Sequence, residues 1–513
     1  MLLIHPPVAK PCEPPAGIAR LSGALKRCGI RQTTLDANLE GLGNLLRSPQ
    51  TSFDTWTNRA FRHLPDHLNS LRHRQGYQHF DHYKRAVKDL NRILEKGALP
   101  ASVRLGLANY EDENLSPTRS SDLIRCAENP EDNPFYPYLK KRLLGLIESE
   151  QPSAIGFSLN YLNQALCTFA MIGILREECP GLPLILGGGL VTSWVRRPGW
   201  KNPFGGLVDH LVAGPGEGPL LSILGVDGRC AEEHTTPNYD SLPVMEYFAP
   251  GLILPYSASI GCYWNRCSFC PERTEGNPYL PTRIEKVVHD LSDLAMKTKP
   301  VLIHILDNAI RPALMKVIAN NPPGPPWYGF ARITQHLTDL EFCMALKRSG
   351  CVMLKLGLES GDQRVLDQMQ KGIDLEQASL ALKTLKKAGI ATYVYLLFGT
   401  PWETMLEARR TLEFTIRHHE MINFLNLAIF NMPIHGPEVV DVETHESYEG
   451  DLSLYTGFEH PKGWNRKLIR QFLDKEFKRH PAVASILRRD PPTFTSNHAP
   501  FFMMKEKDGV NRN

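Results

Sequence analysis

Residues 253–271 read Ile253-Leu-Pro-Tyr-Ser-Ala-Ser-Ile-Gly-Cys-Tyr-Trp-Asn-Arg-Cys-Ser-Phe-Cys-Pro271, and this stretch decides the fold of the residues that follow it. It opens with an apolar run that is typical of a buried strand and continues into a loop with three cysteines. Thiols at C-x4-C-x2-C spacing, here Cys262, Cys267 and Cys270, can hold one metal centre, because the short spacers let their sulfur atoms converge.

Strands and helices alternate after this loop. Further strands are predicted at 301–306, 327–333, 351–358, 391–398 and 424–430, and helices near 283–297, 310–319, 338–349, 374–388 and 403–419. With the strand before the cysteines, this makes six strands and five connecting helices, which predicts a parallel sheet curled into a full or partial barrel over 251–435. Chemistry in such folds lies on the loops after the strands, so we expect the cysteine loop on that face.

The residues upstream, 1–230, show a second alternation. Strands are predicted at 2–5, 32–35, 154–159, 182–186 and 208–213, with helices at 18–28 and 164–178 and glycine-rich turns after several strands. This is the pattern of a doubly wound parallel sheet. We expect a mostly helical insertion at 39–150 and a linker at 231–250, within a Pro- and Gly-containing stretch from about Gly225 to Pro250. We also expect a mostly helical extension at 436–513 whose clearest element is an amphipathic helix at 467–478.

Composition excludes several classes of protein. The chain has 513 residues, of which 42% are hydrophobic and 22% charged, so it is not mainly disordered. Lys and Arg number 58 against 55 Asp and Glu, a balance that argues against a nucleic-acid partner. The first apolar run stops at Pro6 and Pro7, and no stretch approaches a membrane span. We therefore expect a cytoplasmic protein without a membrane partner.

The cysteines divide into two groups. Eight of the 11 are scattered and are expected to be small buried hydrophobes: Cys12, Cys28, Cys126, Cys167, Cys179, Cys230, Cys343 and Cys351. For the three clustered ones, two centres compete. Structural zinc takes four protein ligands, and no second Cys or His pair follows. An iron-sulfur cluster held by three cysteines keeps one iron open for another ligand, as a catalytic cluster requires.

The cysteine loop resembles that of radical S-adenosylmethionine (radical SAM) enzymes, including an aromatic residue, Phe269, before the last cysteine. The usual spacing is C-x3-C-x2-C, and this chain has one extra residue between Cys262 and Cys267. The resemblance implies that Cys262, Cys267 and Cys270 hold a 4Fe-4S cluster, whose open iron binds the amino and carboxylate groups of SAM, near Phe269.

Further positions after successive strands support the resemblance. It implies that Asp307 and Asn308 contact the amino group of SAM and that Arg332 contacts its carboxylate. It also implies that Glu359 and Ser360 belong to the segment that binds the ribose and the methionine part. The turn with Gly399, Thr400 and Pro401 would lie near the adenine. Each has a simpler interpretation. Asp307-Asn308 and Glu359 could cap helices, Arg332 could pair with an acid, and Gly399–Glu403 could be an ordinary turn.

The upstream sheet resembles the cobalamin-binding domain of one radical SAM subgroup. The segments that carry this resemblance are Leu3-Ile-His5-Pro6-Pro7 and the predicted cobalamin residues Ser158, Asn160, Gly187, Gly188, Gly189, Gly214, Gly216 and Glu217. Glycine-rich turns also suit other ligands, and the Asp-x-His-x-x-Gly motif that ligates cobalt in some cobalamin proteins is absent. The predicted fold class is α/β: an N-terminal doubly wound, Rossmann-like domain of the cobalamin-binding type, followed by a partial (β/α)6 radical SAM barrel.

The resemblance implies an enzyme. One electron, from a donor such as flavodoxin or ferredoxin, would cleave SAM to a 5'-deoxyadenosyl radical, and cobalamin would deliver a methyl group to an unactivated carbon of the substrate. One alternative keeps the cluster and SAM but catalyses cyclisation, rearrangement or oxidation without methyl transfer. An alternative of another class is a zinc or iron-sulfur binding protein without catalysis. The sequence does not indicate the substrate.

Overall fold

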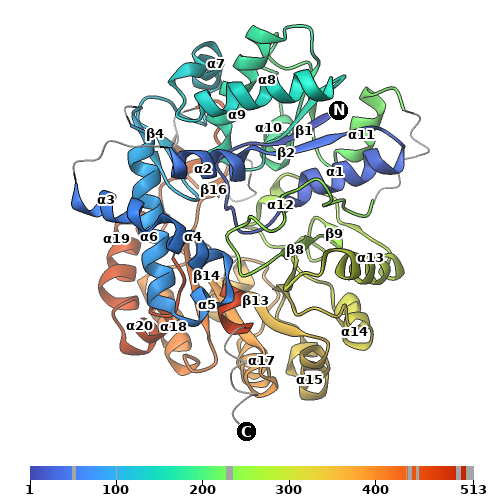
Figure 1. The fold of residues 1–513 in the computed structure, drawn as a ribbon. Coiled ribbons are helices and arrows are strands. Elements are labelled where there is room, and N and C mark those ends of the chain that lie inside the picture. Colours follow the sequence, from blue (N-terminus) through green and yellow to red (C-terminus); the bar gives the residue numbers. More distant parts are fainter. Residues whose placement is uncertain are drawn as a thin grey trace. The chain divides into compact units, whose positions relative to one another are not determined.

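The computed structural model describes residues 1–48, 54–99, 101–226, 235–434, 436, 442–445, 450–492 and 498–503 (Figure 1). The chain forms two compact units. Unit 1 comprises Met1–Leu252, Glu449–Ser453 and Pro492–Thr495, and unit 2 comprises Ile253–Tyr448, Leu454–Pro491 and Ser496–Asn513. No helix in the described part of the chain combines the length and hydropathy that crossing a membrane requires.

Unit 1 is built on a five-stranded parallel sheet with strand order β2-β1-β5-β6-β7. Its strands are β1 (Leu2–His5), β2 (Thr33–Asp36), β5 (Ile155–Ser158), β6 (Leu184–Gly187) and β7 (His210–Val212). Every residue of β1 and β5 is buried, as expected for strands covered on both faces. The strand order reverses between β1 and β5, and ligands of doubly wound folds bind at the carboxyl ends of the strands at such a point.

Helices cover this sheet and fill the region of the predicted insertion. Those of the sheet alternation are α1 (Ala16–Arg27), α9 (Leu162–Glu178), α10 (Gly189–Val195) and α11 (Glu217–Ile223). Between β2 and β5 lie α2 (Ala37–Arg47), α3 (Thr55–Arg62), α4 (Leu64–Arg72), α5 (Arg74–Gln78), α6 (Phe80–Gly97), α7 (Ser120–Glu128) and α8 (Tyr136–Glu150), with the hairpin β3 (Val103–Leu105) and β4 (Tyr110–Asp112). Helix α9 is buried continuously from Gln164 to Leu175, because it packs against α7 and α8.

The described part of the expected linker, 235–250, packs on unit 1. The backbone N–H of Asn238 donates to the carbonyl of Ala19 at 2.8 Å, and the Tyr247 hydroxyl donates to Asp36 at 2.7 Å. Tyr247 and Phe248 are almost fully buried. The prolines of this segment suggested a linker, but its aromatic residues contribute to the core of unit 1.

Unit 2 contains the six-stranded parallel sheet that the sequence predicts, in the order β15-β14-β13-β12-β11-β8. The strands are β8 (Ile253–Tyr256), β11 (Leu302–Ile305), β12 (Trp327–Ala331), β13 (Cys351–Glu359), β14 (Ala391–Phe398) and β15 (Phe424–Ile429). Because neighbours in sequence are neighbours in the sheet and the two edge strands do not pair, the sheet is a partial (β/α)6 barrel.

Helices follow these strands on one side of the sheet (Figure 1): α13 (Ile284–Thr298), α14 (Pro312–Asn320), α15 (Leu340–Arg348), α16 (Gln363–Gln368), α17 (Leu375–Ala388) and α18 (Met405–Arg417). Aspartates cap three of them, since Asp339, Asp362 and Asp374 accept backbone N–H groups at the starts of α15, α16 and α17. Thr404 and Glu407 form a capping box at the start of α18. The short helix α16 lies between β13 and α17 and was not predicted.

The described C-terminal residues combine a small sheet with helices. Strands β16 (Met432–Pro433), β17 (Thr444–His445) and β18 (Tyr455–Phe458) pair in the antiparallel order β16-β18-β17. Helix α19 (Arg466–Phe472), a π turn (Leu473–Phe477) and α20 (Pro481–Leu487) follow. A helix therefore lies where 467–478 predicted one, but the strands, with two to four residues each, were too short to predict from periodicity.

A close backbone approach between two helices of unit 1 gives a test of its packing. A Cβ added at Gly173 of α9 would lie 2.0 Å from the carbonyl oxygen of Ala127, whereas one at Gly145 of α8 meets nothing within 4 Å. We predict that Gly173→Ala lowers the free energy of unfolding by about 1–3 kcal/mol, because α7 must shift. The control Gly145→Ala should be neutral or slightly stabilising. Equal urea midpoints for the two variants would contradict this packing.

Candidate functional site

The cysteine loop follows β8, the first strand of the barrel, and its base is held closed. Strand β9 (Ser259–Ile260) pairs with β10 (Leu280–Pro281) in antiparallel register, so the residues between them form one excursion from the sheet. Gly261 has φ +75°, and a Cβ there would lie 2.4 Å from the carbonyl oxygen of Pro278. Only glycine fits this position, directly before Cys262.

Asp307, which follows β11, also holds the base of the loop. One carboxylate oxygen accepts the backbone N–H groups of Ala258 at 2.7 Å and Ser259 at 3.3 Å, and the other accepts the Ser259 hydroxyl at 2.7 Å. Burial raises the pKa of Asp307, and the hydrogen bonds from Ser259 and Ala258 oppose this rise. Asp307 therefore positions the segment that leads into the cysteines.

The tip of the loop docks on residues that follow β12 and β13. The guanidinium of Arg332 lies over the ring of Trp264, with the carbon 4.0 Å from the ring centroid, and donates to the carbonyl of Lys371. The indole N–H of Trp264 donates to the carbonyl of Gln370 at 3.1 Å. A Cβ at Gly372, whose φ is +63°, would lie 2.2 Å from the Trp264 ring, so glycine is required for this contact.

The three thiols are free, and that of Cys267 lies near positive charge. An Arg332 nitrogen is 4.0 Å from the Sγ of Cys267, which is buried. Burial raises the pKa of Cys267, while the charges of Lys371 and Arg332 lower it. Burial also raises the pKa of Cys270, and the thiols of Cys267 and Cys262 add to this rise, which brings the pKa to about 11. Cys270 therefore interacts electrostatically with the other two cysteines.

This donor set fits an anionic iron-sulfur cluster, because three cysteines on one loop can supply thiolate ligands and two fixed cations lie near one of them, Cys267. Within the described residues, however, no three His, Cys, Asp or Glu side chains are gathered as ligands of a single metal ion. The extra residue of the C-x4-C spacing is accommodated at Asn265, which is exposed and has φ +42°. Asn tolerates this left-handed conformation better than most residues.

Glu359 lies at the end of β13 and forms a buried ion pair. Its carboxylate accepts the ammonium of Lys371 at 2.8 Å, and the two side chains are 12% and 9% exposed. A Cβ at Gly357 would lie 2.5 Å from the Glu359 oxygen, so glycine makes room for the pair. Glu359 has φ +71°, a strained conformation for a non-glycine residue. It caps no helix, since Asp362 caps α16.

The other residues that the sequence predicts to contact SAM differ in whether their side chains already bind other groups of the protein. The Ser360 hydroxyl is fully buried and accepts the N–H of Asp362 at 3.1 Å, so it holds a turn. Asn308 is exposed and Phe269 is half-buried, with the ammonium of Lys371 5.5 Å from the Phe269 ring. Asp307 caps no helix, because α14 begins after Arg311. The SAM assignments stay proposals.

The turn Gly399–Glu403 after β14 is not an ordinary exposed turn. Gly399 has φ +83°, and its N–H donates to the buried carboxylate of Glu403. The C-terminal residues close over it: the indole N–H of Trp464 donates to Glu403 at 3.0 Å, and His460 donates to the carbonyl of Thr400 at 2.9 Å. Burial raises the pKa of Glu403 to about 8. The sequence did not indicate this role for Trp464 and His460.

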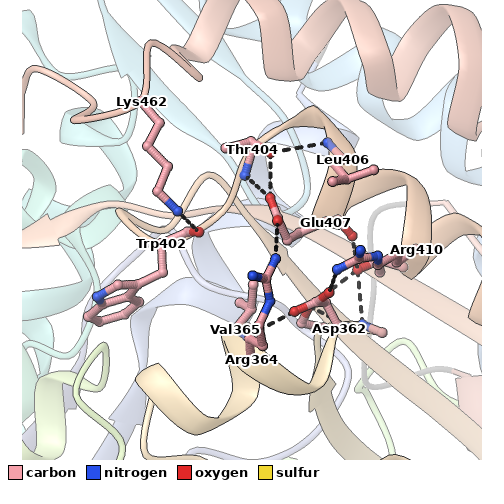
Figure 2. A network of polar contacts seen from close by, with 12 residues as sticks. Asp362, Arg364, Val365, Trp402, Thr404, Leu406, Glu407, Arg410 and Lys462 are labelled. Atoms are coloured by element: carbon pink, nitrogen blue, oxygen red, sulfur yellow. Dashed lines mark hydrogen bonds and ion pairs between the residues drawn. The ribbon is translucent and has the colours of Figure 1, made fainter.

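A polar network joins the turns after β13 and β14 (Figure 2). Arg364 of α16 donates to Glu407 of α18 at 2.9 Å, and Arg410 of α18 donates to Asp362. Lys462 donates to the carbonyl of Trp402 at 2.8 Å. Because these contacts cross between the loops at the carboxyl ends of the strands, the network fixes the loops relative to each other.

In unit 1, the residues predicted for cobalamin lie at the carboxyl ends of β5, β6 and β7. Asn160 donates to the hydroxyl of Ser158 at 3.1 Å and accepts the N–H of Gly189 at 3.0 Å, which brings these turns together. Gly188 has φ +114°. Glu217, which is 5% exposed, forms an ion pair with Arg20, so its carboxylate already has a charged partner within the protein.

His5 provides a further observation at this edge. It ends β1 beside the point where the strand order reverses, is only 7% exposed, and its Nδ1 has no hydrogen-bond partner among the described residues. Burial lowers its pKa, so the imidazole is neutral at neutral pH. An unpartnered buried nitrogen at the expected crevice fits a ligand with polar groups, and cobalamin is one such ligand.

Comparisons with known proteins agree with this geometry. Residues 256–415 match the Radical SAM superfamily. An "Uncharacterized methyltransferase PH0819" from Pyrococcus horikoshii is 28% identical over 193 residues, which are 36% of this chain and 41% of that protein. The chain thus spans about two fifths of this curated relative's length.

Two solved structures share the fold. A radical S-adenosylmethionine methyltransferase, TsrM, from Kitasatospora setae, with tryptophan substrate and a SAM analog, matches with TM-score 0.53 and 14% identity over 99% of this chain and 95% of that one. The apo form of the cobalamin-dependent S-adenosylmethionine radical enzyme OxsB matches with TM-score 0.51 and 16% identity over 71% and 65%. The doubly wound sheet and partial barrel predicted from the sequence are confirmed.

The buried Glu403 predicts a pH dependence of stability. With a pKa of about 8 in the folded chain, against about 4.5 unfolded, it holds a proton that the unfolded chain releases between these pH values. The free energy of unfolding should therefore fall by up to about 1.4 kcal/mol per pH unit from pH 5 to 8. Glu403→Gln should remove this fall, since the amide keeps an acceptor for Gly399 and Trp464.

Denaturant unfolding of both proteins from pH 5 to 8.5 measures the difference. The exposed Glu420, which pairs with Lys386, supplies a control in Glu420→Gln, which should leave the fall in place. Parallel profiles for the wild type and Glu403→Gln would refute the assignment of a buried, protonated carboxyl.

Proposed function

We propose that this chain is a radical SAM enzyme that uses cobalamin to methylate an unactivated carbon, because residues 256–415 match the Radical SAM superfamily. The observation that carries the proposal is the cysteine loop at the carboxyl end of β8, whose three thiols are free and whose Cys267 lies beside Arg332 and Lys371. A 4Fe-4S cluster and SAM held there would supply the radical chemistry that removes hydrogen from a substrate carbon.

The chain's own residues would hold and orient these groups. Cys262, Cys267 and Cys270 would hold the cluster, and the cations of Arg332 and Lys371 would offset the negative charge of the thiolates. Glu359 keeps Lys371 in place by the ion pair of 2.8 Å. The barrel excludes water, which protects a reactive radical from side reactions.

Cobalamin would bind at the carboxyl edge of the unit 1 sheet. The residues proposed to contact it are Ser158, Asn160 and the turns with Gly187–Gly189 and Gly214–Glu217, and His5 adds an unpartnered nitrogen. The topology supports this place, because the strand order reverses beside His5. The electron donor is proposed to be a flavodoxin or ferredoxin, and the compartment the cytoplasm, where free thiols such as the ten described cysteines persist.

Anaerobic reconstitution tests the cluster. Absorption and EPR spectra of the full chain should show a 4Fe-4S cluster, and replacing Cys262, Cys267 and Cys270 by alanine should abolish it, because no ligands remain. Cys179→Ala, a half-buried cysteine in unit 1, should retain the full iron content. About one zinc per chain without iron, or an intact cluster in the triple variant, would refute the ligand assignment.

SAM labelled in its methyl group distinguishes methyl transfer from radical chemistry without methyl transfer. Under reducing, anaerobic turnover with candidate substrates and cobalamin, we expect the label to appear in the product, because methyl transfer moves that group. Label that stays in methionine while 5'-deoxyadenosine accumulates would instead support cyclisation, rearrangement or oxidation without methyl transfer.

A further inference from the structure

A cavity of about 500 Å³ lies in unit 2 at the carboxyl ends of β14 and β15. It is lined by Gly399 and Phe430, which directly follow these strands, and by residues of the C-terminal segment, β16 to α19. The volume falls in the usual range for sites that bind small molecules. Because Gly399 belongs to the turn expected near the adenine of SAM, a ligand here would lie beside the expected nucleoside.

The charge of this cavity is positive. Arg466, Lys467 and Arg470 of α19 line it, and the lining within the described residues contributes one carboxylate, Glu459. Arg466 donates to the carbonyl of Phe430 at 3.2 Å and to the side-chain oxygen of Asn431 at 2.7 Å, both uncharged acceptors. None of the three cations forms an ion pair with a carboxylate in the part of the chain that the structure describes, so their charges are available to a ligand.

The rest of the lining is aromatic and apolar. The rings of Phe430 and Phe458 meet edge to face with centroids 5.8 Å apart, and Trp464 lies beside them in the wall. His460 contributes a ring that burial keeps neutral by lowering its pKa, and both its nitrogens are used within the protein. The lining of the cavity therefore combines cations with flat apolar surface.

We propose that this cavity anchors the substrate, and that the substrate is a small organic acid. Its anionic group meets the cations of α19, and its apolar or aromatic body lies against Phe430 and Phe458. This inference rests on the proposed function, since it takes the occupant to be the molecule on which the radical acts. It adds to the proposed function the chemical class of the substrate.

Binding of a probe acid to the full-length chain tests the anchor without any turnover. The probes are 4-phenylbutyrate and its uncharged analogue 4-phenylbutyramide, measured by ligand-observed NMR titration. We expect the acid to bind at least fivefold more tightly than the amide. The variant Arg466→Gln/Lys467→Gln/Arg470→Gln should lose that preference, whereas Lys475→Gln, an exposed cation outside the cavity, should keep it. Phe458→Ala should weaken both probes.

Three results would overturn the proposal: equal binding of acid and amide, an unchanged preference in the triple glutamine variant, or displacement of the acid by SAM in the reconstituted protein, which would assign the cavity to SAM. Circular dichroism of the variants checks that they are folded. If the acid does not bind while reduction still cleaves SAM, the anchor fails and the proposed function stands. If the acid binds but SAM is never cleaved, the proposed function fails, and the acid is not a substrate.

Discussion

The candidate site depends on how the cysteine loop is held at two places. At its base, Asp307 accepts three hydrogen bonds from Ala258 and Ser259, and β9 pairs with β10. At its tip, Arg332 lies on Trp264 and binds the carbonyl of Lys371. The loops after β8, β11, β12 and β13 are thus joined before any cofactor binds, which reduces the ordering that cluster binding must supply.

The same constraint explains several unusual backbone positions. Gly261 and Gly372 allow the loop to approach its neighbours more closely than any Cβ would permit, and Gly357 leaves room for the Glu359–Lys371 ion pair. Glu359 itself has a positive φ, which costs free energy and persists only where the surroundings enforce it. Strain, a buried ion pair and three thiols occur together at one end of the sheet, as expected for a site that is arranged in advance for chemistry.

The sequence predicted the sheet elements well, because parallel strands such as β1 and β13 are continuous apolar runs separated by clear helical periods. It also located the cysteine loop. It could not show that Asp307 accepts hydrogen bonds from Ala258 and Ser259, or that Trp464 and His460 bind the turn Gly399–Glu403. These contacts join residues up to 61 positions apart in the chain. The short strands β16–β18 have no readable period, and the basic face of α19 suggested a solvated surface, whereas three of its cations line a cavity.

We propose that the cysteine loop holds a cluster that would bind and cleave SAM. The most direct measurement is 5'-deoxyadenosine formation by the anaerobically reconstituted chain on addition of dithionite and SAM, with the EPR spectrum of the reduced cluster recorded before and after SAM is added. The account predicts a SAM-dependent change in the spectrum and 5'-deoxyadenosine that requires the three cysteines. A spectrum unaffected by SAM, with no 5'-deoxyadenosine above the level of the triple cysteine variant, would contradict it.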